Sequence, residues 1–269
     1  MTLQEIYNRL WSEYAAQNPS AGAILNILKD KGETVKNDHI AFRTFNLPKI
    51  GLEVMSTPFR LNGYVEMGEY KFEEKHLFAK HYEHATDRSQ PKVFISQLIL
   101  EDFSPSLQEV IRKSVSSIKE NRLDPEYLIF AGRLWDLPSY ETYLKLRDES
   151  EYAAWVYVYG FRTNHFTVSS NALKNYRKLE DLNELIKQNG FIMNTAGGEI
   201  KGTEAEYLKQ SSIMADIIDV EFREGVYKIP ACYYEFAERF ALPDGNLYNG
   251  FIAKSADKIF ESTNFYKKG

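Results

Sequence analysis

The chain has 269 residues, of which 43% are hydrophobic and 26% are charged, a composition typical of soluble globular proteins. Its 33 basic and 38 acidic residues give a net charge of −5, so no basic field is available to attract a nucleic-acid backbone. The single cysteine, Cys232, excludes an intramolecular disulfide and a multi-cysteine zinc site. The sequence contains no apolar run of membrane-spanning length and no apolar signal-peptide core, so we expect a cytoplasmic protein without nucleic-acid or membrane partners.

The N-terminal part of the chain predicts two helices followed by a strand. Within residues 2–31, apolar side chains recur at helical spacing, and the segment NPSAG divides the run into two helices. Residues 36–46 predict a strand, and residues 46–63 predict a turn with a short helix. Apolar runs between turn residues then predict three strands, at 64–72, 75–84 and 91–100.

The rest of the chain alternates between helical and strand patterns. Residues 104–154 predict mostly helices, and residues 156–170 predict a strand. Residues 171–190 predict a helix that ends at a glycine, and a short helical piece is expected near residues 203–212. Two further strands are predicted, at 215–222 and 231–240.

Two segments of the sequence are similar to each other. DHIAFRTFN and NHFTVSSN each begin with a polar residue and histidine, continue in apolar alternation, and end in asparagine before a helix. Each is followed by a helix and three strands, so we expect an α+β protein with two strand–helix–three-strand modules. The expected plan is a single domain over residues 1–269, with N-terminal helices (1–32), a first module (36–100), a helical insertion (101–155), a second module (156–240) and a C-terminal segment (241–269).

The strand at 36–46 has two different faces. Side chains alternate along a strand, so one face is apolar and the other carries His39 and Arg43. In the second of the similar segments, His165 shares its face with Thr167. An arginine on the face of the first histidine could hold a substrate carboxylate through a bidentate pair.

The last predicted strand adds a carboxylate, because Glu235 shares one face with Tyr233. Two imidazoles (His39 and His165) and one carboxylate from three strands form the facial triad of non-haem iron(II) sites, which leaves positions open for substrate and oxygen. The alternative is an ordinary surface, since a strand histidine is usually solvated or bonded to a neighbour, and a strand glutamate is most often exposed.

Other polar residues are weaker candidates. Alternation puts His76 and His84 on one face and His81 on the other, which indicates a polar strand end, although one of them could support a metal ligand. Gln210 and Ser212 in QSSIMAD are either part of a helix end or polar contacts to a ligand.

In combination, several blocks resemble one known family. DHIAFRTF, PKVFISQL, TNHFTV, GGEIKGTEAEYLKQSSIMAD, IPACYYEFAERF and GFIAKSADKIFEST are similar to segments of the 2-oxoadipate dioxygenase/decarboxylase family, the 2-hydroxyglutarate synthases. The resemblance runs from about residue 30 to the C-terminus. It implies a fold like that of the vicinal oxygen chelate enzymes, in which paired modules form a curled, mixed β-sheet around a metal.

The resemblance also implies an activity and the residues for it. The family's metal ligands fall on His39, His165 and Glu235, its carboxylate-binding arginine falls on Arg43, and its metal is Fe(2+). Family members convert 2-oxoadipate and O₂ to 2-hydroxyglutarate and CO₂, so one 2-oxo acid serves as both co-substrate and substrate. Some members are longer than this chain, so the substrate contacts that their later segments contribute are not assigned to residues here.

Two other functional classes are compatible with the sequence. A metal-dependent hydrolase or isomerase could use the same scaffold, because one fold can support several chemistries. Such an enzyme would use zinc or nickel in place of iron and would turn over without oxygen. A small-molecule binding protein would have no metal site, or a fully closed one. The oligomeric state cannot be read from this sequence.

Overall fold

The computed structural model describes residues 1–252 and 258–259. The chain divides into two compact units. Unit 1 contains Met1–Trp11, Ala41–Asn164 and Ile217–Ile229, and unit 2 contains Ser12–Ile40, His165–Asp216 and Pro230–Gly269. The expected C-terminal segment, 241–269, lies partly outside the described residues, and the single-domain plan stays a prediction.

Unit 1 contains the strands of the first predicted module. Strand β1 (Asn37–Phe45) begins in unit 2 and ends in unit 1, where the order of strands is β2-β3-β4-β1. Antiparallel pairing joins β2 (Tyr64–Phe72), β3 (Leu77–His84) and β4 (Lys92–Leu98), which confirms the three predicted strands. The expected short helix before them is present as α3 (Leu52–Met55) and α4 (Thr57–Leu61).

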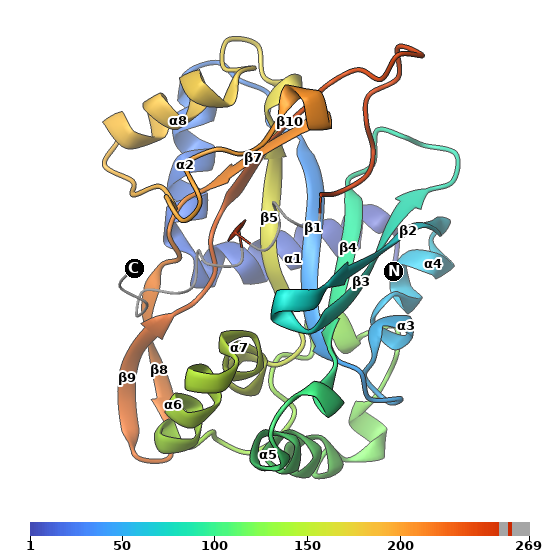
Figure 1. Cartoon of the computed structure of the whole chain (residues 1–269), viewed down its shortest axis with the longest axis vertical. Coiled ribbons are helices and arrows are strands. Elements are labelled where there is room, and N and C mark those ends of the chain that lie inside the picture. Colours follow the sequence, from blue (N-terminus) through green and yellow to red (C-terminus); the bar gives the residue numbers. More distant parts are fainter. Residues whose placement is uncertain (253–257, 260–269) are drawn as a thin grey trace. The chain divides into compact units, whose positions relative to one another are not determined.

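The helical insertion also belongs to unit 1. Its helices are α5 (Pro105–Ser116), α6 (Tyr140–Glu149) and α7 (Glu151–Tyr159), and each is capped by the hydroxyl of the preceding serine. Figure 1 shows a hairpin of β8 (Ile217–Phe222) and β9 (Gly225–Pro230) beside α6. Tyr140 of α6 stacks on Tyr227 of β9 with their ring centroids 3.7 Å apart.

The strand predicted at 156–170 is wrong in its first part. Residues up to Tyr159 belong to α7, and only Thr163–Ser169 form a strand, β5. Nearly every side chain of α7 is buried, so its apolar run has no polar face to reveal the helical period. The helix ends at Gly160, which has φ of +69° and whose added Cβ would lie 2.3 Å from the carbonyl oxygen of Gly132.

Unit 2 contains the second set of strands, in the order β5-β10-β7-β6. Strand β10 (Glu235–Arg239) pairs parallel to β5 and antiparallel to β7 (Leu208–Ser212), and β7 pairs with the short β6 (Lys201–Thr203). The sheet is therefore mixed, as predicted. Unit 2 also contains the helices α2 (Pro19–Asp30) and α8 (Leu179–Gln188). Helix α1 (Leu3–Gln17) begins in unit 1 and ends in unit 2.

Three further predictions need correction. The helix predicted at 171–190 begins only at Leu179, because the carboxylate of Glu33 accepts hydrogen bonds from the backbone N–H groups of Lys174 and Asn175 and keeps them out of a helix. The helical piece expected near residues 203–212 is mostly strand β7.

The third correction concerns residues 215–222, whose strand β8 pairs with β9 in unit 1 and does not belong to the second module. The strand predicted at 231–240 is present in part, as β10, and begins at Glu235.

Short 3₁₀ turns complete the described chain at Glu73–Lys75, Leu100–Asp102, Glu120–Arg122, Leu128–Phe130, Ser170–Ala172 and Glu204–Glu206. Among the described helices, none combines the length and the apolar character that crossing a bilayer requires.

Candidate metal centre

His39 is buried near the start of β1, with 2% of its surface exposed. Its Nδ1 atom lies 2.8 Å from Oδ1 of Asp38. Because an ionised carboxylate only accepts hydrogen bonds, this contact places the imidazole proton on Nδ1 and leaves the lone pair of Nε2 available. His39 is thus held in the tautomer that a metal ligand needs.

Asp38 is itself fixed by an arginine. Nε and Nη2 of Arg239 donate to the two carboxylate oxygens of Asp38 at 2.7 and 2.8 Å, a bidentate pair. Nη1 of the same guanidinium donates to the carbonyl oxygens of Tyr248 and Gly250 at 2.9 and 2.8 Å. The pairing holds the carboxylate of Asp38 in its orientation toward His39.

The carboxylate of Glu235 lies between two imidazoles. Its Oε1 is 3.4 Å from Nε2 of His39, and its Oε2 is 3.3 Å from Nε2 of His165. Each residue offers one ligand atom, and the three atoms lie within 4.8 Å of one another. A metal ion bound at about 2 Å from each ligand requires this kind of proximity, so the three buried side chains fit a metal ion after small rotations.

Burial and hydrogen bonding act in opposite directions on Glu235. Only 1% of the residue is exposed, and burial raises the pKa of its carboxyl group, while His39 and a hydrogen bond from Gln210 oppose that rise. Nε2 of Gln210 donates to Oε1 of Glu235 at 2.6 Å. A carboxylate this deeply buried is stable in its charged form when a cation neutralises it, which a bound metal ion would do.

Aromatic side chains surround the two histidines. The ring of Tyr233 stacks on His165 with centroids 4.8 Å apart, and the ring of Phe251 meets His39 edge-on at 4.8 Å. The hydroxyl of Tyr14 donates to the backbone oxygen of Tyr233 at 2.5 Å and so holds the chain just before β10. These contacts restrict both imidazole rings and lower the local polarity.

The remaining site candidates of unit 2 are close to these three residues. Oγ1 of Thr167 lies 3.0 Å from Nε2 of His39, and Ser212 is the fully buried cross-strand partner of Glu235. With Gln210 and Tyr233, the four predicted residues are therefore placed around the candidate ligands. Their roles toward a substrate stay predictions.

Arg43 belongs to unit 1 and is described within that unit. It is 1% exposed, and its Nη1 is 3.8 Å from Oε1 of Glu151. The guanidinium carbon lies 5.0 and 5.4 Å from the ring centroids of Tyr152 and Trp155. The arginine is thus held by α7, and its proposed carboxylate contact stays a prediction.

The other three histidines of the first module, His76, His81 and His84, each contact different neighbours. His81 is 3% exposed and lies between the hydroxyl of Tyr70, at 2.8 Å, and a carboxylate oxygen of Glu83, at 3.1 Å. His76 has left-handed φ and lies 3.2 Å from Asp102.

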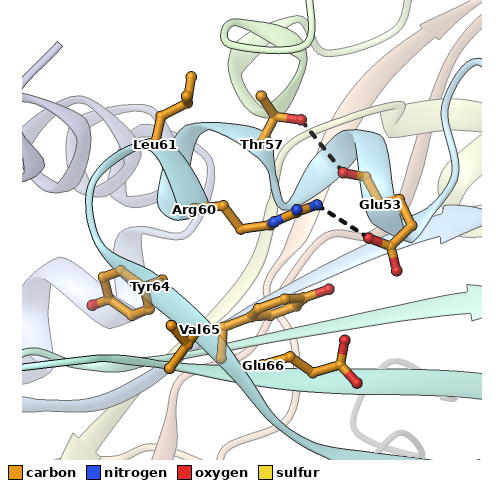
Figure 2. A pocket seen from close by; sticks show the side chains of 8 residues that line it. Glu53, Thr57, Arg60, Leu61, Tyr64, Val65 and Glu66 are labelled. Atoms are coloured by element: carbon orange, nitrogen blue, oxygen red, sulfur yellow. Dashed lines mark hydrogen bonds and ion pairs between the residues drawn. The ribbon is translucent and has the colours of Figure 1, made fainter.

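A pocket with a volume of about 660 Å³ lies elsewhere in unit 1 (Figure 2). Its lining includes Glu53, Arg60 and Glu66, and none of the predicted site residues. Nη1 of Arg60 is 3.3 Å from a carboxylate oxygen of Glu53, and Lys80 donates to both glutamates. Its charged groups therefore neutralise one another, so we assign no function to this pocket.

Two residues that support the candidate ligands, Asp38 and Arg239, were not among the predicted site residues. The signal for Asp38 was its position directly before His39, but strict alternation assigned it to the opposite face. Arg239 is 201 residues from Asp38, and no local pattern joins them.

The two sets of strands and the buried His–His–Glu site are typical of glyoxalase-like, vicinal-oxygen-chelate folds with a candidate metal centre. A Ralstonia eutropha JMP134 protein of the glyoxalase superfamily shares this fold, with a TM-score of 0.75 at 21% identity over 90% of this chain and 83% of its own. The family model of the 2-oxoadipate dioxygenases/decarboxylases matches residues 2–129 and 127–247. The chain belongs to this family.

The match differs in extent from the resemblance seen in the sequence. It begins at residue 2 rather than near residue 30, and it ends before the block GFIAKSADKIFEST, most of which lies outside the described residues. The family assignment and the predicted α+β fold class are both confirmed.

Relatives of this chain carry related names. The chloroplastic/amyloplastic 2-oxoadipate dioxygenase/decarboxylase of Oryza sativa subsp. japonica is 34% identical over 93% of this chain and 75% of its own length. The solved hydroxyglutarate synthase of Oryza sativa, in complex with 2-oxoadipate, has a TM-score of 0.91 at 32% identity, covering 97% of this chain and 91% of its own. A Shewanella frigidimarina NCIMB 400 protein named as a hydrolase has a TM-score of 0.88 at 46% identity, covering 93% and 97%.

The ligand set predicts which substitutions remove the metal. After anaerobic reconstitution with iron(II) and desalting, we expect His39→Ala, His165→Ala and Glu235→Ala to retain little iron, because each loses one of three ligands. His76→Ala is the matched control, since this partly exposed histidine pairs with Asp102 in unit 1 and should not alter iron content. Wild-type iron content in folded His39→Ala and His165→Ala proteins would contradict the site.

The hydrogen bond between Asp38 and His39 predicts a graded effect. Asp38→Asn keeps the size of the side chain but removes the charge that orients His39, so the dissociation constant for the metal should rise on the order of 10- to 100-fold. Titration with cobalt(II) measures it. Glu33→Gln is the control, because Glu33 is also buried in unit 2 but bonds the backbone of Lys174 and Asn175. Equal affinities in both variants would show that Asp38 does not support the ligand.

Proposed function

We propose that the protein is an iron(II)-dependent dioxygenase/decarboxylase that converts a 2-oxo diacid and O₂ to a 2-hydroxy acid and CO₂. For 2-oxoadipate the product would be 2-hydroxyglutarate, with both oxygen atoms retained in the products. The observation that carries the proposal is the buried cluster of His39, His165 and Glu235 in a chain of this family. The rice hydroxyglutarate synthase, crystallised with 2-oxoadipate, supports the substrate class.

The chemistry of the donor atoms favours iron. Two imidazoles and one carboxylate, without cysteine, are the ligands of non-haem iron(II) oxygenases. When bound, iron(II) would chelate the 2-oxo acid and activate O₂ at the positions that the protein leaves open. Cys232 is the only cysteine of the chain, so a site with several thiolates is excluded.

The protein's own residues would hold and orient this centre. Asp38 keeps the proton of His39 on Nδ1, and the rings of Tyr233 and Phe251 exclude water from the two imidazoles. Gln210 holds one oxygen of Glu235 and so limits the rotation of that carboxylate. The site residues would thus be fixed before substrate binds, which lowers the entropic cost of reaching a reactive geometry.

We also propose that Arg43 binds the distal carboxylate of the substrate. It lies four residues after His39 in β1, and it is buried against Tyr152 and Trp155, so little water competes for its guanidinium. Planar, bidentate contact with a carboxylate is the interaction that arginine makes best.

Oxygen and carbon dioxide stoichiometry tests the proposed function. With 2-oxoadipate and iron(II) we expect one O₂ consumed for each CO₂ released, without any added 2-oxoglutarate. An oxygen electrode and a CO₂ assay on the same reaction measure this ratio. Turnover without O₂, or with zinc in place of iron, would favour a hydrolase or isomerase instead. A strict need for a second 2-oxo acid would indicate an ordinary two-substrate oxygenase.

Substitution of Arg43 tests the substrate class. We expect Arg43→Ala to raise the apparent Michaelis constant for 2-oxoadipate on the order of tenfold or more, since about 1.4 kcal/mol corresponds to tenfold. Arg43→Lys should be impaired less, because lysine keeps the charge but not the fork of donors. The matched substrate is 2-oxohexanoate, which lacks the distal carboxylate and should be used poorly by the wild type. Unchanged ranking of the two acids in Arg43→Ala would remove the reason for naming a diacid.

A further inference from the structure

Lys201 is a buried cation in β6, with 4% of its surface exposed. Its Nζ donates to the backbone oxygens of Asn194, at 2.5 Å, and Glu199, at 3.4 Å. Within the described part of the chain, no carboxylate lies within the 4.0 Å that defines an ion pair with this ammonium. Buried charges are normally paired, so a lysine in this state is unusual.

Strand register places Lys201 on the face that carries the candidate metal ligands. Opposed residues of antiparallel strands share a face, and the pairs Lys201–Gln210 and Gln210–Ala237 connect β6 through β7 to β10. Two residues before Ala237 on β10, Glu235 points to the same side. The hydrogen bond from Gln210 to Glu235 confirms that these side chains face the same space.

The ammonium also lies level with Glu235 along the strands. Glu235 is opposite Ser212, whose backbone oxygen accepts from the N–H of Asn194 at 2.8 Å. The oxygen of Asn194 in turn accepts from Nζ of Lys201. Burial lowers the pKa of Lys201 to about 8, and the charge of Glu235 acts against that decrease. The two charges therefore interact without forming a direct ion pair.

A buried acceptor without a described donor lies on the same face of the sheet. Oε1 of Gln210 is buried and accepts no hydrogen bond from any described residue, although its Nε2 is bonded to Glu235. A buried acceptor without a donor is costly unless a ligand or water completes it. Neighbouring positions on β6 and β7 thus offer a cation and an acceptor toward the candidate metal centre.

We propose that Lys201 binds the carboxylate next to the keto group of the 2-oxo acid substrate. The inference rests on the proposed function and adds a residue to it. This carboxylate is the one that would approach the metal, and Lys201 lies on the same face of the sheet as the ligand Glu235. An ammonium there favours 2-oxo acids over neutral carbonyl compounds, because it balances the charge that the carboxylate brings into a buried site.

Lys201 and Arg43 then have separable tasks. Every 2-oxo acid has the carboxylate assigned to Lys201, whereas only a diacid has the distal carboxylate assigned to Arg43. Loss of Lys201 should therefore weaken the binding of monoacids and diacids alike, and loss of Arg43 should weaken the binding of diacids alone.

Anaerobic binding tests the assignment without turnover. Iron(II)-loaded wild type, Lys201→Met and Lys201→Arg are titrated with 2-oxoadipate and with 2-oxohexanoate, and the charge-transfer absorption of the chelate is followed. We expect the dissociation constants of both acids to rise on the order of tenfold or more in Lys201→Met, and less in Lys201→Arg, which keeps the charge. Iron affinity and the thermal midpoint should remain near wild-type values.

Lys209→Met is the matched control. This lysine lies on β7 opposite Gly202, its side chain pairs with Glu180 at 3.0 Å, and it stands on the other face of the sheet from Gln210. Its loss should leave both dissociation constants unchanged.

Three results would overturn the proposal. Wild-type affinity for both acids in Lys201→Met would show that the ammonium does not contact substrate, and selective loss of the diacid would assign it to the distal carboxylate. Lys201→Met could instead lose iron or stability and regain substrate affinity at saturating iron. Lys201 would then have only a structural role, holding the backbone of Asn194 and Glu199. Failure of the proposed function is distinct, because the wild type itself would then give no chelate absorption.

Discussion

A buried carboxylate between two imidazoles is the constraint on which the rest of the described site depends. Glu235 is almost fully excluded from water, and an ionised group in such a place is unstable without a cation. The central position of β10, between β5 and β7, brings His165, Thr167 and Gln210 within reach of that carboxylate. The strands of unit 2 thus position their polar side chains around the carboxylate of Glu235.

An element of the fold could be predicted where its sequence alternates clearly between polar and apolar side chains or is bounded by turn residues. The strands at 64–72 and 91–100 are bounded by turn residues, and both were predicted nearly to their ends. Helix α7 was taken partly for a strand because burial on all sides removes the polar face that marks a helix. The sequence of strand β7, LKQSS, does not predict a strand, because polar residues occupy both faces and most of them are buried.

The candidate ligands could be predicted because similar segments place a histidine at the same point of a strand, and the last strand supplies the carboxylate. The residues that hold these ligands in place could not be predicted from the sequence. Asp38 reaches His39 from the adjacent position, where alternation predicts separate faces, and its partner Arg239 comes from a distant strand. Lys201 follows two glycines in the segment GGEIK, where nothing in the local sequence indicates burial, and its pairing with Gln210 shows that it points inward. Such contacts depend on tertiary structure, which a single sequence does not display.

Arg239 connects the candidate ligand His39 with the backbone near the end of the described chain. The same guanidinium binds Asp38, the carbonyl oxygens of Tyr248 and Gly250, and the face of Phe251, whose ring in turn touches His39. A metal ion bound at His39 and the packing of residues 248–251 would therefore be thermodynamically linked. Linkage is reciprocal. The free energy by which a bound metal would stabilise the packing of this segment equals the free energy by which the packed segment would strengthen metal binding. Residues 248–251 and the candidate metal centre would then form one cooperative element, in which a substitution that loosens one part would also weaken the other.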